Sequence, residues 1–176
     1  MLKKWEKISE RTIIKNDHWS YNVDNFIIDK KFKGEYHYVH TLGSSMVIPL
    51  SPENKILLTK QFRYLNNKES WEFPCGAVEE GLTIEENAIK ELREESGYTT
   101  SKLIKIGEFS PYTGAADEIC TLFLASNLIH SPLPKDETED FETDFFSKKE
   151  IQDMIDGNII WDGLTLAAWS LIINKI

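Results

Sequence analysis

The sequence predicts a mixed α/β protein in which helices cover a mixed β-sheet, with additional strands at the N-terminus. Three observations predict this class. Segments rich in β-branched and aromatic residues fill the first half of the chain, helical patterns with clear capping residues occur later, and the order is β, then α, then β, then two helices. This order does not fit regular βαβ winding, and it favours an α+β arrangement or a sandwich around a mixed sheet.

The expected strands are runs of β-branched and aromatic residues separated by turn-like segments such as DKKFKG and SPEN. They comprise residues 21–28, 35–41, 44–50, 55–62, 71–73, 102–109, 118–126 and 141–146. Residues 1–42 are expected to form N-terminal strands and residues 43–176 the main domain.

Three helices are expected from their capping patterns. Thr83 with Glu86 is a capping box, and Gly97 stands where a C-terminal cap belongs, so a helix is predicted over 84–96. Two further helices begin after Ser147 and Asp162, the first of them with a second capping box.

Length and composition indicate one globular domain. The chain has 176 residues, of which 41% are hydrophobic and 28% charged, enough for a single core. Its formal net charge of -9 disfavours binding to nucleic acids and to anionic membranes.

No segment of the sequence predicts a membrane span or a cysteine-based site. The longest apolar segment, GLTLAAWSLII, is too short to cross a bilayer, so a cytoplasmic protein is expected. Cys75 and Cys120 are far apart and lack metal-ligand spacing, which favours two buried thiols.

The helix predicted over 84–96 carries an unusual group of carboxylates. Its core-facing stripe is Ile84, Ala88 and Leu92, and beside it stand Glu91, Glu94 and Glu95, whereas Lys90, Arg93 and Glu86 are expected on the far side. Mutual repulsion would destabilise this helix unless a counter-charge is present, and oxygen-only ligands favour Mg²⁺ or Mn²⁺. The alternative is a solvated acidic helix face, the usual meaning of such runs.

The order of residues in this region resembles the Nudix signature, G-x5-E-x7-R-E-U-x-E-E-x-G-U, where U is apolar or aromatic. Gly76, Glu91, Glu94-Glu95 and Gly97-Tyr98 match it without gaps. Leu82 replaces the first glutamate and Lys90 replaces the arginine. If those two side chains normally pair, loss of the acid would let a lysine serve as a point charge.

The resemblance extends over most of the chain. The segments QFR (61–63), WEFPCG (71–76), SPYTGAADE (110–118) and DETED (136–140) look like the ADP-ribose pyrophosphatase branch of the Nudix hydrolases. The family fold is an α/β/α sandwich with a mixed β-sheet.

The resemblance also implies roles for the acidic residues. Glu91 and Glu95 are expected to bind the metal directly, with the backbone carbonyl of Cys75 as a further ligand, and Glu94 to act as a ligand or to orient one. A glutamate from a late loop acts as the base, which points to Glu137, with Glu139 as the second candidate. The alternative for DETED is an acidic turn without a catalytic task.

Other residues are implied to contact the substrate. Arg63 corresponds to an arginine that contacts the diphosphate, although a surface salt bridge is the alternative. Trp19 corresponds to a base-stacking position and Tyr38 is a candidate from a neighbouring chain, although core packing is the commoner fate of aromatic residues. The branch often exchanges N-terminal strands between subunits, so a homodimer is expected.

The expected function is therefore Mg²⁺-dependent hydrolysis of a nucleoside diphosphate linked to a sugar, with ADP-ribose cleaved to AMP and ribose 5-phosphate. Two alternatives are open: hydrolysis of another nucleotide sugar of the GDP-hexose type, and a Nudix-like module that senses a nucleotide without cleaving it. Leu82 and Lys90 favour the sensor, and the retained glutamates oppose it. A purely structural role has little support.

Overall fold

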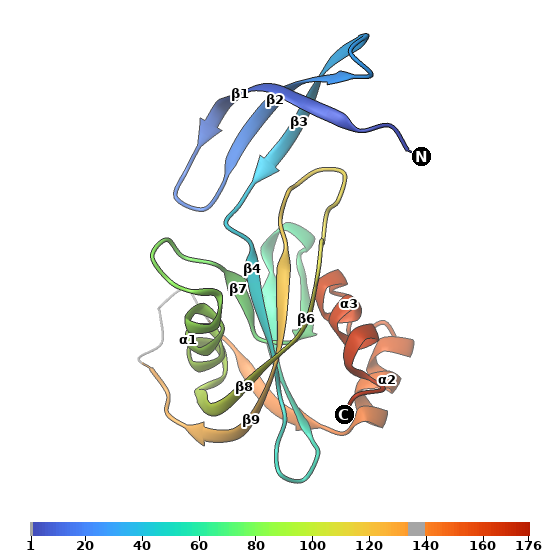
Figure 1. Cartoon of the computed structure of the whole chain (residues 1–176). Coiled ribbons are helices and arrows are strands. Elements are labelled where there is room, and N and C mark those ends of the chain that lie inside the picture. Colours follow the sequence, from blue (N-terminus) through green and yellow to red (C-terminus); the bar gives the residue numbers. More distant parts are fainter. Residues whose placement is uncertain (1, 134–139) are drawn as a thin grey trace.

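The chain folds into a main α/β body and a separate N-terminal sheet (Figure 1). The structure is a computed structural model that describes residues 2–133 and 140–176. The N-terminal sheet is antiparallel and consists of β1 (Trp5–Lys15), β2 (Ser20–Ile28) and β3 (Phe32–His40). The boundary expected between residues 42 and 43 falls in the link from β3 to β4.

The main body contains two sheets. One has the strand order β7-β4-β9-β8, made from β4 (Ser44–Pro49), β7 (Cys75–Ala77), β8 (Tyr98–Phe109) and β9 (Cys120–His130). Its β4 and β9 are parallel and its other pairs are antiparallel, so this sheet is mixed. The second sheet has the order β10-β5-β6 and is antiparallel, made from β5 (Ile56–Arg63), β6 (Lys68–Glu72) and β10 (Glu142–Phe146). A 3₁₀ turn, Tyr64–Asn66, joins β5 to β6.

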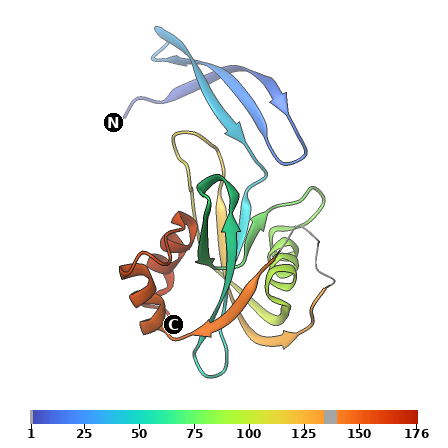
Figure 2. The same cartoon turned by 180° about the vertical axis from the view of Figure 1, so that it is seen from behind.

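Helices cover the two outer sides of these sheets, as the opposite views in Figures 1 and 2 show. On one side lies α1 (Ile84–Ser96), and on the other lie α2 (Lys148–Asp156) and α3 (Gly163–Ile172). One apolar cluster, which includes Ile48, Leu58 and Trp169, packs beneath α2 and α3. A second cluster packs Ala88 and Leu92 of α1 against Val47 and Phe123. The predicted sandwich with a mixed sheet is confirmed.

The three predicted helices are confirmed together with their caps. Thr83 and Glu86 form both hydrogen bonds of the capping box, and Gly97 ends α1 in the left-handed conformation at φ 75°. Ser147 caps α2 through a second capping box, and Asp162 caps α3 by accepting a hydrogen bond from the Thr165 amide. No helix in the described part of the chain has the length and apolar character needed to cross a membrane.

The strands differ from the predictions at several places. The individual strands β1 and β7 were not predicted, β6 begins at Lys68 rather than at residue 71, and β8 begins at Tyr98 rather than at residue 102. Every residue of β1 is exposed, so its side chains follow no burial pattern. Backbone pairing with β2, from Trp5↔Ile28 to Lys15↔Ser20, defines this strand instead.

Candidate active site

A cavity of about 1240 Å³ lies between the N-terminal sheet and the main body. Its walls come from the β1–β2 turn, the end of β5, the strand β7 with the loop after it, and the inner face of α1. The residues from these elements that bear on the chemistry are Trp19, Arg63, Cys75, Gly76, Glu91 and Glu95. The fold therefore brings together side chains from distant parts of the sequence.

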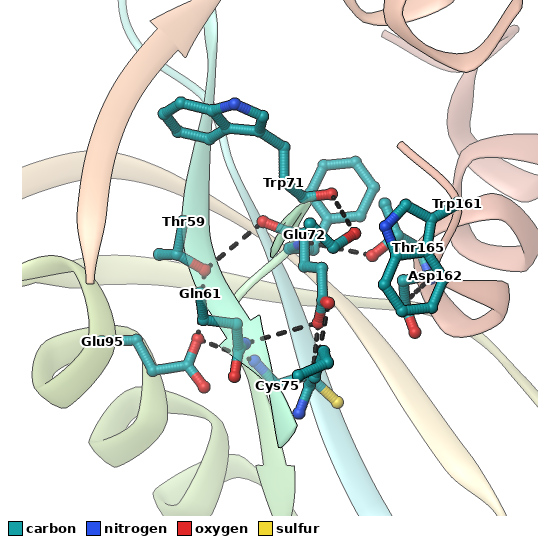
Figure 3. Close-up of polar contacts among 12 residues, drawn as sticks. Thr59, Gln61, Trp71, Glu72, Cys75, Glu95, Trp161, Asp162 and Thr165 are labelled. Carbon is teal, nitrogen blue, oxygen red and sulfur yellow. Dashed lines mark hydrogen bonds and ion pairs between the residues drawn. The ribbon is translucent and has the colours of Figure 1, made fainter. Parts of the chain in front are cut away.

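Glu95 is buried at the base of this cavity. Glu95 is 8% exposed. Its Oε2 accepts hydrogen bonds from the Thr59 hydroxyl and the Cys75 amide, each at 3.3 Å (Figure 3). Burial raises the pKa of Glu95 well above its ordinary value, and the negative charge of Glu91 raises it further. A nearby positive charge would stabilise the ionised form of this carboxyl group.

Glu91 is packed against the backbone at Gly76. A Cβ atom at position 76 would lie 2.2 Å from Glu91 Cδ and 2.3 Å from its Oε2. Only glycine leaves room there, so the signature glycine allows the β7 backbone to approach the carboxylate of α1. The Glu91 side chain remains 13% exposed and lines the cavity.

Glu94 is held by Lys90, which corrects the expectation that Lys90 lies on the far side of the helix. Lys90 Nζ is 2.5 Å from Glu94 Oε2, 3.2 Å from Glu79 Oε1 and 3.9 Å from Glu91 Oε1. Residues four apart are neighbours on a helix, and the long lysine side chain reaches the acidic edge. Burial lowers the pKa of Lys90, but its hydrogen bonds to Glu94 and Glu79 outweigh this and raise the pKa overall.

Arg63 lines the cavity and is also bound to a buried acid, Glu72. Arg63 Nε donates to Glu72 Oε1 at 2.9 Å, a second hydrogen bond joins Nη2 to Oε2, and Gln61 Nε2 donates to Oε2 at 3.4 Å. Burial raises the pKa of Glu72, although the guanidinium opposes this shift. This pairing means that Arg63 forms a salt bridge in addition to any substrate contact.

Sequence reasoning missed Glu72 and Asn87. Glu72 is the last residue of β6 and lies between Trp71 and Phe73 in the sequence, and a charge between two aromatic residues was the available signal. Asn87 is fully buried in α1; its Oδ1 accepts from the Glu79 amide at 3.1 Å and its Nδ2 donates to Ser45 Oγ at 2.9 Å. An asparagine inside a helical pattern was the corresponding signal, and here it fastens the loop before α1 to β4.

The two aromatic candidates lie in different environments. Trp19 is 41% exposed and lines the cavity at the β1–β2 turn. Tyr38 is not among the described residues that line the cavity, and its hydroxyl lies 3.4 Å from both Glu10 Oε2 and Asp24 Oδ1, to either of which it can donate. The structure of this chain therefore brings Trp19, but not Tyr38, to the carboxylates.

Cys75 and Cys120 are both free, and the neighbouring Cys120 thiol, together with burial, raises the pKa of the Cys75 thiol well above its ordinary value. Cys120 is buried as expected, but Cys75 is only half-buried because it lies on the short strand beside the cavity. Glu137 and Glu139 lie outside the described residues. Asp140 and Phe141, which follow them, line the cavity.

The donor atoms fit a hard divalent cation. Within residues 2–133 and 140–176 no three histidine, cysteine, aspartate or glutamate side chains are already gathered as a metal site. Glu94 forms an ion pair with Lys90, and Glu95 accepts hydrogen bonds from Thr59 and the Cys75 amide. Glu91 and the buried Glu95 nevertheless repel each other beside an open cavity, and carboxylate oxygens are the ligands that Mg²⁺ and Mn²⁺ prefer.

Comparisons with known proteins show the family of the chain. A family model described as NUDIX domain matches residues 40–163. The chain is 31% identical over 170 residues to an ADP-ribose pyrophosphatase of Bacillus subtilis, covering 93% of this chain and 92% of that protein. It is also 36% identical over 86 residues to a methanol dehydrogenase activator of Bacillus methanolicus, which covers 49% of this chain and 46% of that protein.

A crystal structure of an ADP compounds hydrolase has the same fold. It superposes with a TM-score of 0.84 at 16% identity and covers 99% of this chain and 95% of that chain. The N-terminal sheet is therefore part of the shared architecture.

Proposed function

The chain belongs to the Nudix hydrolase family, and from this premise we propose that it hydrolyses ADP-ribose to AMP and ribose 5-phosphate in a reaction that depends on Mg²⁺ or Mn²⁺. The observation that carries the proposal is the cavity whose lining includes Glu91 and Glu95 together with Trp19 and Arg63. Its volume of about 1240 Å³ is ample for a nucleotide sugar. The similarity to an ADP-ribose pyrophosphatase over 93% of the chain supports the choice of substrate.

In this proposal Glu91, Glu95 and the backbone carbonyl of Cys75 hold the metal ion. A cation bound there would neutralise charge on the diphosphate oxygens and would make an attacking water more acidic. Glu95 is anchored by Thr59 and the Cys75 amide, so its position is fixed before any ligand binds. Glu94 assists as a ligand or as an orienting group once it is released from Lys90.

Arg63 binds the diphosphate of the substrate in this proposal. Its Nε and Nη2 bind Glu72, which leaves further guanidinium N–H groups for phosphate oxygens. Glu72 therefore positions the guanidinium at the cavity wall.

Trp19 stacks on the base, because its ring lies at the cavity wall and is partly open to solvent. Glu137 is the proposed base and Glu139 the second candidate, since Asp140 and Phe141, the described residues that follow them in the sequence, line the cavity.

We further propose a homodimer formed through the N-terminal sheet. This sheet exposes large apolar side chains, namely Trp5, Ile8, Ile13, Ile14 and Phe32. Such an assembly is the setting in which Tyr38 could reach the site of a neighbouring chain. Light scattering coupled to gel filtration should give twice the 20.4 kDa chain mass, and a monomer would reject the dimer.

A nucleotide sensor is the second candidate function, and the Lys90–Glu94 ion pair favours it. An ammonium group 2.5 Å from a signature carboxylate competes with a metal ion for that ligand. Under this alternative the chain binds a nucleotide sugar without cleaving it.

Incubation of the purified protein with ADP-ribose and Mg²⁺, followed by detection of AMP, tests the proposal. Glu94→Gln and Glu95→Gln should lose activity, whereas Glu85→Gln, an exposed glutamate on the same helix, should retain it. Binding without cleavage by the wild type supports the sensor. Equal cleavage by the wild type and both site variants would reject the site assignment, and faster cleavage of GDP-mannose would reject ADP-ribose as the substrate.

A further inference from the structure

One face of the N-terminal sheet lines the cavity, and this face, which we call the roof, is polar. Opposite residues on antiparallel strands share a face, and two such rows are Lys15–Ser20–His40 and Thr12–Asn22–Tyr38. All of these except Tyr38 line the cavity, as does Glu10 in the next row. The sheet therefore presents hydrogen-bonding groups to whatever occupies the cavity.

Asn22 is the buried member of this roof that lacks a complete set of partners. It is 2% exposed, and its Nδ2 donates to Glu10 Oε1 at 3.3 Å. Its Oδ1 is the one buried side-chain polar atom without a hydrogen-bond partner in the described part of the chain. Such atoms are rare in folded proteins because water has been removed and nothing replaces it.

The orientation of the Asn22 amide is fixed by its neighbour. A carboxylate can only accept hydrogen bonds, so the amide nitrogen must face Glu10. Glu10 is itself held by Lys7 and by the Tyr38 hydroxyl, and the hydrogen bond from Lys7 lowers the pKa of Glu10, which keeps it ionised. Asn22 is thus held as an acceptor, with its oxygen left for a donor from outside the chain.

At Asn22 and Glu10 the chemistry of this roof disfavours the diphosphate and selects another part of the substrate. Phosphate oxygens at neutral pH have no proton to donate, and the Glu10 carboxylate would repel them. The groups of a nucleotide sugar that can donate are the sugar hydroxyl groups and an exocyclic amine of the base. Arg63 and the carboxylates, on the wall of the main body, are left for the diphosphate.

Resting on the proposed function, we propose that Asn22 Oδ1 is a specificity-determining acceptor that binds an N–H or O–H donor at the base or sugar end of the nucleotide sugar. Loss of one such hydrogen bond, which leaves a buried donor unpaired, should weaken binding on the order of tenfold. Asn22 then contributes to recognition without taking part in the cleavage step.

Calorimetric titration with the two products, AMP and ribose 5-phosphate, in the presence of Mg²⁺ tests this proposal without any cleavage. Asn22→Leu keeps the side-chain size and removes the acceptor, so it should weaken at least one product about tenfold. Asn25→Leu is the matched control, because Asn25 lies on the same strand, donates to Ser9 Oγ and does not line the cavity. It should bind both products as the wild type does.

The wild type itself identifies which donor is bound. IMP replaces the exocyclic amine of AMP with a carbonyl, and 2′-deoxy-AMP and 2-deoxyribose 5-phosphate each remove a hydroxyl group. One of these should bind the wild type about tenfold more weakly than its parent, whereas Asn22→Leu should not distinguish them.

Unchanged product affinities in Asn22→Leu would overturn the proposal. This is the result expected if a water molecule, and not the ligand, donates to Asn22 Oδ1. If that variant does not fold, equal wild-type affinity for every analogue and its parent would overturn it. A wild type that does not cleave ADP-ribose rejects the proposed function, whereas cleavage with unchanged binding by Asn22→Leu rejects the role of Asn22 alone.

Discussion

Replacement of Gly76 by alanine tests the packing of the site through a single methyl group. The new Cβ would lie 2.2 Å from Glu91 Cδ, whereas carbon atoms are at their best separation at about 3.5–4.0 Å, so the Glu91 carboxyl group must retreat by roughly 1.3 Å. Gly76 lies in β7, and its φ is not in the left-handed region, so alanine adds no backbone strain. The change therefore acts through the displaced carboxylate.

A displacement of about 1 Å at a catalytic group can lower activity about a hundredfold, so kcat/KM for ADP-ribose should fall by about two orders of magnitude in Gly76→Ala. The affinity for Mn²⁺, measured by electron paramagnetic resonance, should fall as well. Because the Glu91 carboxyl group is at the end of a flexible side chain, the melting temperature should change little.

Two further variants sharpen this experiment. Gly107→Ala is the control, because Gly107 also lies in a strand and a Cβ there meets nothing within 4 Å. Adding Glu91→Asp to Gly76→Ala shortens the clashing side chain and should restore part of the Mn²⁺ affinity. Wild-type activity and Mn²⁺ affinity in Gly76→Ala would refute the role of Glu91 as a ligand.

Three other predictions concern charges at the site. In the metal-free protein Glu95→Gln should melt a few degrees above the wild type at about pH 7, because the raised pKa of Glu95 makes its ionised form oppose folding. The difference should vanish towards about pH 3, where the group is protonated in the folded and the unfolded state, and a pH-independent difference would contradict this. Arg63→Ala should lower the free energy of unfolding by about 2 kcal/mol, because it leaves Glu72 buried without the guanidinium. Adding Glu72→Gln should restore the melting temperature but not the affinity for the diphosphate, and full recovery of both would mean that Arg63 is only structural. Lys90→Met should raise Mn²⁺ affinity several-fold by removing the ammonium beside Glu94, and calorimetry showing weaker Mn²⁺ binding would contradict that competition.

The helices and the signature segment could be predicted because their signals are local. The capping box of Thr83 and Glu86, the left-handed Gly97 and the spacing of the apolar residues define α1 within the stretch itself. The same holds for the glutamates of the signature, whose one-turn spacing places them on neighbouring faces of the helix. β1 was missed for the opposite reason, because hydrogen bonds to β2 define it and burial of its own side chains does not.

The sequence by itself determined the family, the α1 helix and the acidic residues available to a metal ion, since these depend on residue order and helical spacing. Only the tertiary structure decided which of them are buried, which are paired and which face the cavity. The partners of Lys90, the pairing of Arg63 with Glu72, and the oxygen of Asn22 left without a donor all depend on side chains meeting across different elements. Desolvation and the exact positions of partner atoms set the energies of such contacts, and neither is encoded in the spacing of residues along one strand or helix.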